Sequence, residues 1–154
     1  ILHLNNLTPG EVILEITEQY ALRTAAQLES LNRLRMRGFG ISLDDFGTGF
    51  TNIQQLKTLP FTEIKIDKTL ISNIETDQFS QVIVSSLVNI AIQEDLFIVA
   101  EGIERVEELE YLDRYKEFIL MQGFLLCRPK AKEDFLNWSI SWRQMVKTAT
   151  GQRR

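Results

Sequence analysis

The chain has 154 residues, 44% of them hydrophobic, and its 17 basic and 21 acidic side chains give a formal net charge of −4. This balance, with no Lys/Arg run before the terminal Arg153-Arg154, argues against a nucleic-acid partner, and the length suits a single domain. One cysteine excludes an intrachain disulfide, and no apolar run reaches the roughly 18 residues that a membrane span needs.

Short β-branched runs alternate with longer amphipathic stretches along the chain. Residues 11–17 favour a strand, and residues 20–37 carry apolar side chains at helical spacing and end at Gly38. The later elements are expected as strands over 39–43, 62–66, 96–100 and 118–121, and as helices over 52–59, 78–93, 104–115 and about 131–147. The regular alternation, without hairpin signals, predicts an α/β fold with a parallel sheet, and both a doubly wound sheet and a barrel fit it.

Polar side chains recur where the predicted strands end. In a barrel of parallel strands these ends meet on one face, where active sites lie. Carboxylate and amide oxygens suit Mg²⁺ or Mn²⁺, and the absence of a Cys/His cluster argues against a typical zinc site. The residues concerned are Glu15 and Glu18, Asp44 and Asp45, Lys65 and Asp67, Glu101, and Gln122.

Each of these features also has a structural interpretation. An Asp-Asp pair is usually a solvated turn, but Asp44-Asp45 follows an apolar strand and precedes Phe46-Gly47-Thr48-Gly49, whose glycines permit tight backbone near a ligand. Lys65 could form a structural salt bridge instead of binding water or phosphate. Trp138 and Trp142 are expected to pack the inner face of the last helix, with partner docking as the alternative, and Cys127 to be inert packing.

Five ordered motifs resemble the EAL domain. They are Glu15-Ile16-Thr17-Glu18, residues 43–50 (LDDFGTGF) with residues 56–60 (LKTLP), Ile64-Lys65-Ile66-Asp67, residues 99–104 (VAEGIE), and residues 122–125 (QGFL) with Arg128-Pro129. The similarity extends from about residue 8 to residue 134.

The resemblance implies a TIM-type (β/α)8 barrel that hydrolyses the bacterial second messenger cyclic di-GMP to linear pGpG with Mg²⁺ or Mn²⁺ at a two-metal site. It implies that Glu15, Asp44, Asp45 and Glu101 bind metal. Lys65 would orient or help deprotonate the attacking water, Gln122 would support it, and Glu18 would tether the loop over residues 46–52. The residues expected at the substrate are Asp67, Gly47, Thr48 and Gly49.

The chain also departs from the family pattern. The Glu-Ala-Leu strand and the Asn ligand are missing, so residues 1–147 are expected to be the C-terminal part of an EAL domain, about five βα units, followed by a disordered tail over 148–154. A partial barrel would be nearly inactive alone and would form a dimer or higher oligomer through exposed edges. The longer parent would be a cytoplasmic phosphodiesterase joined to sensory or GGDEF domains, and segments outside this chain could carry a membrane anchor. The alternatives are a non-catalytic EAL module, acting as a cyclic di-GMP receptor or scaffold, and a distant enolase-like barrel.

Overall fold

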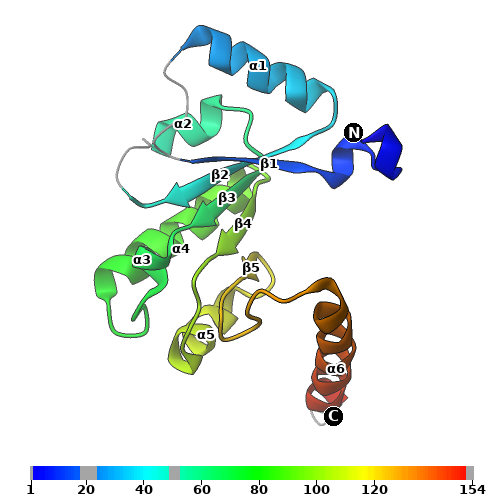
Figure 1. The fold of residues 1–154 in the computed structure, drawn as a ribbon. Coiled ribbons are helices and arrows are strands. Elements are labelled where there is room, and N and C mark those ends of the chain that lie inside the picture. Colours follow the sequence, from blue (N-terminus) through cyan, green and yellow to red (C-terminus); the bar gives the residue numbers. More distant parts are fainter. Residues whose placement is uncertain (1, 18–23, 49–52, 152–154) are drawn as a thin grey trace.

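A five-stranded parallel sheet organises the chain. The computed structural model describes residues 2–17, 24–48 and 53–151. The strands pair in chain order, β1-β2-β3-β4-β5, and every pairing is parallel. The predicted α/β class is thus confirmed, and Figure 1 shows the strands fanning in sequence from β1 to β5. The strands are β1 (Ile13–Thr17), β2 (Gly40–Phe46), β3 (Glu63–Ile66), β4 (Phe97–Ala100) and β5 (Ile119–Met121).

Helices connect successive strands, as the alternating pattern predicts. The α-helices are α1 (Ala25–Met36), α2 (Ile53–Thr58), α3 (Lys68–Ile71), α4 (Gln78–Gln93), α5 (Val106–Leu112) and α6 (Lys132–Gly151), and the 3₁₀ helices are η1 (His3–Asn5), η2 (Pro9–Glu11) and η4 (Asp113–Tyr115). The bounds of α4 match the prediction because Asp77 caps it, its carboxylate accepting a hydrogen bond from Phe79 N at 3.0 Å. None of the described helices combines the length and apolar character of a transmembrane span.

Several predicted elements differ from the structure in extent. The strand expected to end at residue 43 continues to Phe46 as β2. The helix expected over 104–115 starts only at Val106, and its last turn tightens into η4. The short helix α3 was not predicted, and α6 continues to Gly151, beyond the end expected at residue 147. The first part of the helix expected over 20–37 lies outside the described residues; the described part, α1, begins at Ala25 after the capping residue Thr24.

The core lies between one face of the sheet and the helices that follow the strands. Alternate residues of the central strands point to this face and are fully buried, because strand side chains alternate between faces. Helix α4 supplies the facing apolar side chains, and together they form one continuous cluster. The largest contributors are Ile41, Leu43, Ile64, Ile66, Ile98, Val84 and Leu87. The other face of the sheet is therefore free to carry polar chemistry.

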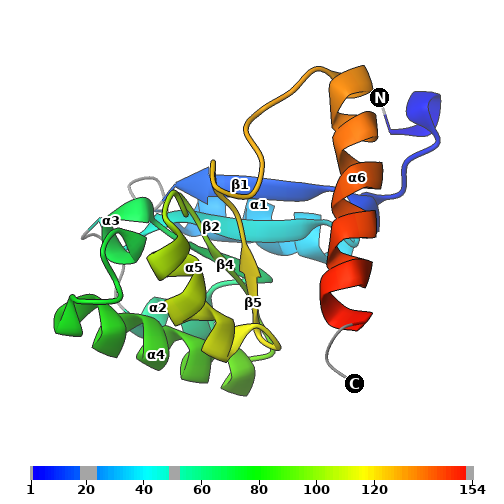
Figure 2. The same ribbon diagram turned by 90° about the horizontal axis from the view of Figure 1, so that it is seen from below.

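Helix α6 stands apart from the other helices, on the far side of the loop that follows β5 (Figures 1 and 2). Trp138 and Trp142 were expected to pack its inner face against the body. Instead they remain half-buried and stack on each other with ring centroids 5.5 Å apart, and Phe135 lies 5.5 Å from Trp138. No residue of α6 from Lys132 to Arg143 is buried, so over these residues the aromatic face of the helix is only partly covered.

Candidate metal and phosphodiester site

Lys65 lies at the centre of the polar face of the sheet. Its neighbours on β3, Ile64 and Ile66, are fully buried on the core face, so the Lys65 side chain points the other way. The Lys65 side chain is only 10% exposed, and its ammonium ion-pairs with carboxylates from three different strands or their ends. The distances from Nζ are 2.9 Å to Glu15 Oε1, 3.0 Å to Asp44 Oδ1 and 2.8 Å to Glu101 Oε1.

The charge on Lys65 is strongly favoured in this setting. Burial by itself lowers the pKa of the Lys65 ammonium, but its hydrogen bonds to the three carboxylates, first of all to Glu101, outweigh burial and raise the pKa well above its ordinary value. A buried ammonium is tolerated only with such partners. Lys65 is therefore a fixed positive charge among the residues predicted to bind metal.

Asp44 and Asp45 lie at an irregularity in β2. The pairing of β2 with β3 shifts register between Leu43 and Phe46, and Asp45 has a φ of 58°, in the left-handed region. The carbonyl oxygen of Asp45 accepts hydrogen bonds from Thr48 N at 3.3 Å and Thr48 Oγ1 at 3.1 Å. Asp44 at this bulge faces Lys65, and the chain then turns into Gly47. Gly47 has a φ of 114°, and an added Cβ would lie 2.4 Å from Leu70 Cδ1, so both the backbone and the space favour glycine.

Glu101 and Gln122 are held by backbone hydrogen bonds that extend the sheet beyond β4 and β5. Glu101 N donates to Ile66 O at 3.1 Å, and Gln122 N donates to Ala100 O at 2.9 Å. Gly123 follows where no side chain fits, because an added Cβ would lie 2.1 Å from Ile103 O. The ends of β4 and β5 are thus fixed side by side.

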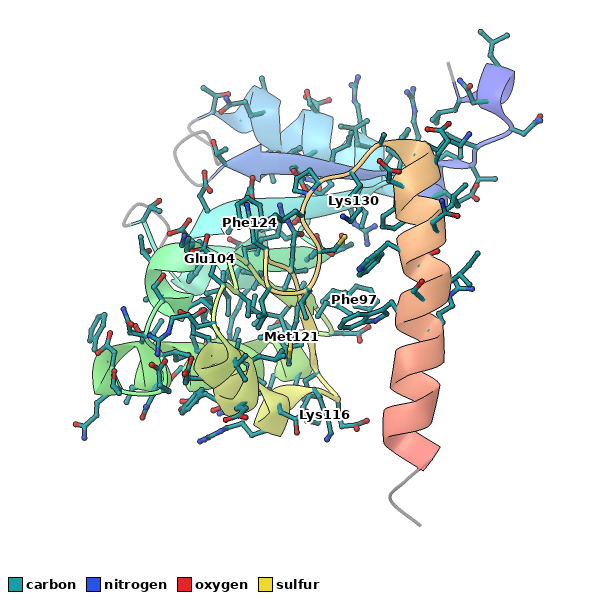
Figure 3. The ribbon with its side chains drawn as sticks, turned by 60° about the horizontal axis from the view of Figure 1, so that its bottom comes forward. Phe97, Glu104, Lys116, Met121, Phe124 and Lys130 are labelled. Carbon is teal, nitrogen blue, oxygen red and sulfur yellow. The ribbon has the colours of Figure 1, made fainter. Side chains whose placement is uncertain are left out.

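A pocket of about 450 Å³ opens beside Glu101. One wall is apolar and aromatic, and the rest is polar. Figure 3 shows Glu104 and Phe124 close together at this end of the molecule, well away from Lys116. The lining residues are Asp67, Lys68, Glu101, Gly102, Glu104, Gln122, Gly123, Phe124, Cys127 and Pro129. Predicted residues Asp67, Glu101 and Gln122 therefore share one pocket.

The remaining predicted site residues lie at the pocket wall, beside the β2 bulge, or outside the described residues. Asp67 caps helix α3, its carboxylate accepting hydrogen bonds from Thr69 N at 2.8 Å and Thr69 Oγ1 at 2.6 Å, so it shapes the pocket wall as well as facing it. Gly47 and Thr48 are exposed next to the bulge and do not line the pocket described above. Glu18 and Gly49 lie outside the described residues.

Glu108 is a buried carboxylate that the sequence did not single out. Glu108 belongs to a charged run over residues 104–108, a pattern typical of a solvated helix face, yet it is only 3% exposed. It accepts hydrogen bonds from the backbone N–H groups of Asn73 at 3.2 Å, Glu104 at 3.0 Å and Arg105 at 3.1 Å. Burial raises the pKa of Glu108, but these three donors outweigh it and lower the pKa below its ordinary value. The signal available in the sequence was a glutamate three residues after the helix N-cap, Arg105.

The donor set suits a hard divalent cation. Glu15, Asp44 and Glu101 offer carboxylate oxygens, the ligands that Mg²⁺ and Mn²⁺ take. Asp44 Oδ1 is fully buried, and apart from its ion pair with Lys65 it accepts no hydrogen bond from the described residues. Within residues 2–17, 24–48 and 53–151, however, no three acidic, His or Cys side chains surround a point that would hold a metal ion. The carboxylates instead converge on the Lys65 ammonium.

Comparison with known proteins identifies the family. The model of the EAL domain matches residues 1–129. The chain belongs to the EAL domain family. It is 44% identical over 133 residues to the bifunctional diguanylate cyclase/cyclic di-GMP phosphodiesterase MucR of Pseudomonas aeruginosa, covering 86% of this chain and 19% of MucR. It is 36% identical over 134 residues to the cyclic di-GMP phosphodiesterase RocR of the same species, covering 86% of this chain and 34% of RocR.

Solved EAL structures match the fold closely. The MucR phosphodiesterase in complex with cyclic di-GMP gives a TM-score of 0.77 at 42% identity, over 87% of this chain and 54% of that one. The EAL domain of Mycobacterium smegmatis DcpA gives 0.80 at 30% identity, over 89% and 61%. Klebsiella pneumoniae BlrP1 in complex with manganese and cyclic di-GMP gives 0.77 at 32% identity, over 83% and 33%. EAL domains are TIM-type barrels, so the five-stranded EAL sheet confirms the predicted fold class. The chain spans between a fifth and a third of MucR and RocR.

Proposed function

We propose that this chain forms most of the active face of an EAL domain that hydrolyses cyclic di-GMP to linear pGpG within a longer protein. The observation that carries the proposal is the convergence of Glu15, Asp44 and Glu101 on one point from β1, β2 and the end of β4. Similar proteins that are named cyclic di-GMP phosphodiesterases, and EAL structures in complex with that nucleotide, support the choice of substrate.

Glu15, Asp44, Asp45 and Glu101 would hold Mg²⁺ or Mn²⁺ at a two-metal site, with Asp44 shared between the ions. A divalent cation there supplies positive charge to the phosphodiester oxygens and to the attacking water. A solved EAL relative in complex with manganese supports a divalent ion. The register shift at Asp44-Asp45 breaks the strict alternation of side chains along β2, which would let two successive carboxylates of one strand reach the metal.

Lys65 would hold and orient the attacking water, because its ammonium is already at the centre of the acidic cluster and keeps its proton. Gln122 would support the same water from the end of β5, where a backbone hydrogen bond fixes it beside β4. Glu18 would tether the loop over residues 46–52. These groups would position the water and screen charge. As the water oxygen bonds to phosphorus and the ribose oxygen leaves it, the departing ribose oxygen takes up the proton that the water loses and becomes a hydroxyl.

The pocket beside Glu101 would receive one half of the dinucleotide. Its exposed Phe124 ring offers a stacking surface, and the Arg128 guanidinium lies 4.9 Å from the ring centroid. Asp67 would contact the nucleotide or support the wall, and Gly47, Thr48 and Gly49 would approach the substrate from the β2 turn.

The chain alone would have little or no phosphodiesterase activity. It covers 54% and 61% of two solved EAL chains, and the family's Glu-Ala-Leu and Asn ligands have no counterpart in it. In the sheet described, β1 and β5 each pair with one neighbour and bear exposed apolar side chains, Ile13 and Leu120. Because of these edges, we expect a dimer or oligomer. We also expect the chain to belong to a cytoplasmic protein with sensory or GGDEF domains.

The test is Mn²⁺-dependent formation of pGpG by the full-length protein that contains this chain. Asp44→Asn is expected to lose activity by at least a hundredfold, while Asp113→Asn, an exposed aspartate paired with Lys116, is expected to retain it. Binding of cyclic di-GMP without hydrolysis by the wild type would contradict the proposal and favour the receptor alternative. Unchanged activity of Asp44→Asn would overturn the site.

A further inference from the structure

Lys65 occupies the position toward which the proposed metal ligands point. An ammonium group has three N–H donors, and here Lys65 Nζ forms ion pairs with three carboxylates, at 2.8 to 3.0 Å. The ligands come from separate strands, so nothing local in the sequence forces them together. The ion pairs of Lys65 link β1, β2 and the end of β4.

The surrounding charge is otherwise unbalanced. Glu63, two residues before Lys65 on the same face of β3, is 8% exposed and has no ion-pair partner within the parts of the chain that the structure describes. The other nearby lysine, Lys68, is engaged with Glu104 at 2.7 Å at the pocket rim. Without Lys65, Asp44 and Glu101, whose side chains are only 20% and 17% exposed, would repel each other and the half-exposed Glu15 at short range.

We propose that Lys65 is an internal counter-ion that holds the metal-binding carboxylates together before metal arrives and competes with the divalent cation for the same oxygens. The inference rests on the proposed metal site and adds a role for Lys65 that precedes catalysis. The three carboxylate oxygens already surround a cation, the Lys65 ammonium.

The competition follows from geometry. Asp44 Oδ1 is fully buried and, among the described residues, contacts only Lys65, so a metal ion bound to that oxygen would lie close to the ammonium and the two cations would repel each other. A metal ion bound at about 2.0–2.1 Å would require the ammonium to withdraw from at least one carboxylate. The withdrawn Nζ would then be free to hold a water, which links metal binding to the positioning of the nucleophile.

The experiment compares Mn²⁺ affinity and thermal stability in Lys65 variants of the full-length protein. Lys65→Met removes the counter-ion, Lys65→Arg keeps the charge, and Lys57→Met makes the same charge change at an exposed surface pair with Glu94. Mn²⁺ affinity is measured by titration calorimetry, and the unfolding midpoint by scanning fluorimetry in chelator and in saturating Mn²⁺.

Lys65→Met is expected to unfold at a lower temperature than wild type in chelator, and to bind Mn²⁺ about tenfold more tightly, which corresponds to about 1.4 kcal/mol. Saturating Mn²⁺ should raise the unfolding temperature of Lys65→Met most of the way to that of the wild type. Lys65→Arg and Lys57→Met should bind Mn²⁺ with affinities close to that of the wild type. Lys65→Gln, whose amide can still donate hydrogen bonds, is measured in parallel in case the apolar variant does not fold, with the same direction expected.

Two outcomes separate the inference from the proposed function. If the wild type binds Mn²⁺ and the neutral Lys65 variants bind it no more tightly, or more weakly, then Lys65 is not a competitor and only the inference is overturned. If the wild type binds no Mn²⁺, or binds it as well after Glu101→Gln, the proposed metal site is itself wrong and the inference falls with it.

Discussion

Replacing Glu108 by Gln tests whether one buried carboxylate fixes the loop that follows β4. Its Oε2 accepts from the backbone N–H groups of Glu104 and Arg105, and its Oε1 accepts from Asn73 N. A glutamine can keep the two bonds of one oxygen only by turning its NH₂ group toward the N–H of Asn73. The N–H of Asn73 then faces the NH₂ group, so a buried donor meets another donor. The two bonds from Glu104 N and Arg105 N go to a neutral acceptor instead of a carboxylate.

The magnitude follows from those three bonds. An unsatisfied buried donor costs about 1–3 kcal/mol, and a bond to a neutral acceptor is weaker than one to a carboxylate by about 1 kcal/mol. One unsatisfied donor and two weakened bonds together lower the expected free energy of unfolding of Glu108→Gln by about 3–5 kcal/mol in urea denaturation at pH 7. Glu110→Gln is the matched control, because Glu110 is exposed on the same helix, and its effect should stay within about 0.5 kcal/mol.

The pH dependence supplies an independent check. The folded-state pKa of Glu108 lies below its ordinary value, so the carboxylate stabilises the fold above its unfolded-state pKa, about 4.3, and this stabilisation is lost as the pH falls through the lower, folded-state value. The stability difference between the wild type and Glu108→Gln should be constant above about pH 5 and shrink below about pH 4. Equal effects of Glu108→Gln and Glu110→Gln, or a difference that grows in acid, would refute the reasoning.

Two further substitutions probe the frame of the pocket. Gly123→Ala should destabilise the protein by about 3 kcal/mol or more, because the new Cβ would overlap the backbone of Ile103. The measurement is a fall in the unfolding midpoint. The control Gly10→Ala should be tolerated, because the atom nearest to its added Cβ lies at 3.9 Å. Asp67→Ala should cost about 1 kcal/mol in chemical denaturation through the lost cap of α3, and an unchanged midpoint would show that the two hydrogen bonds to Thr69 do not stabilise the fold.

The order of the elements could be predicted because it depends on local patterns. Apolar spacing marked α4, and the β-branched runs marked the strands of the sheet. The polar residues at strand ends were also visible, and parallel pairing then brings such ends together. That reasoning placed Glu15, Asp44 and Glu101 on one face, where the structure has them around Lys65.

The features that were missed depend on distant partners. The bulge at Asp44-Asp45 arises from the pairing of β2 with β3, which no pattern within residues 39–46 reports. Glu108 resembles its acidic neighbours in sequence, and only the approach of Asn73 from another loop makes it a buried acceptor. Helix α6 has apolar and polar faces, but its sequence does not show whether another element covers the apolar face. In the structure its aromatic side chains stack on one another and are only partly covered.

The most direct measurement of the central claim is the position of Mn²⁺ in crystals of the full-length protein, located by anomalous scattering. The account predicts a peak within bonding distance of the carboxylates of Asp44 and Glu101, with Lys65 Nζ withdrawn from at least one of the three carboxylates it now contacts. A peak elsewhere, with the Lys65 ammonium still bound to Glu15, Asp44 and Glu101 together, would contradict it.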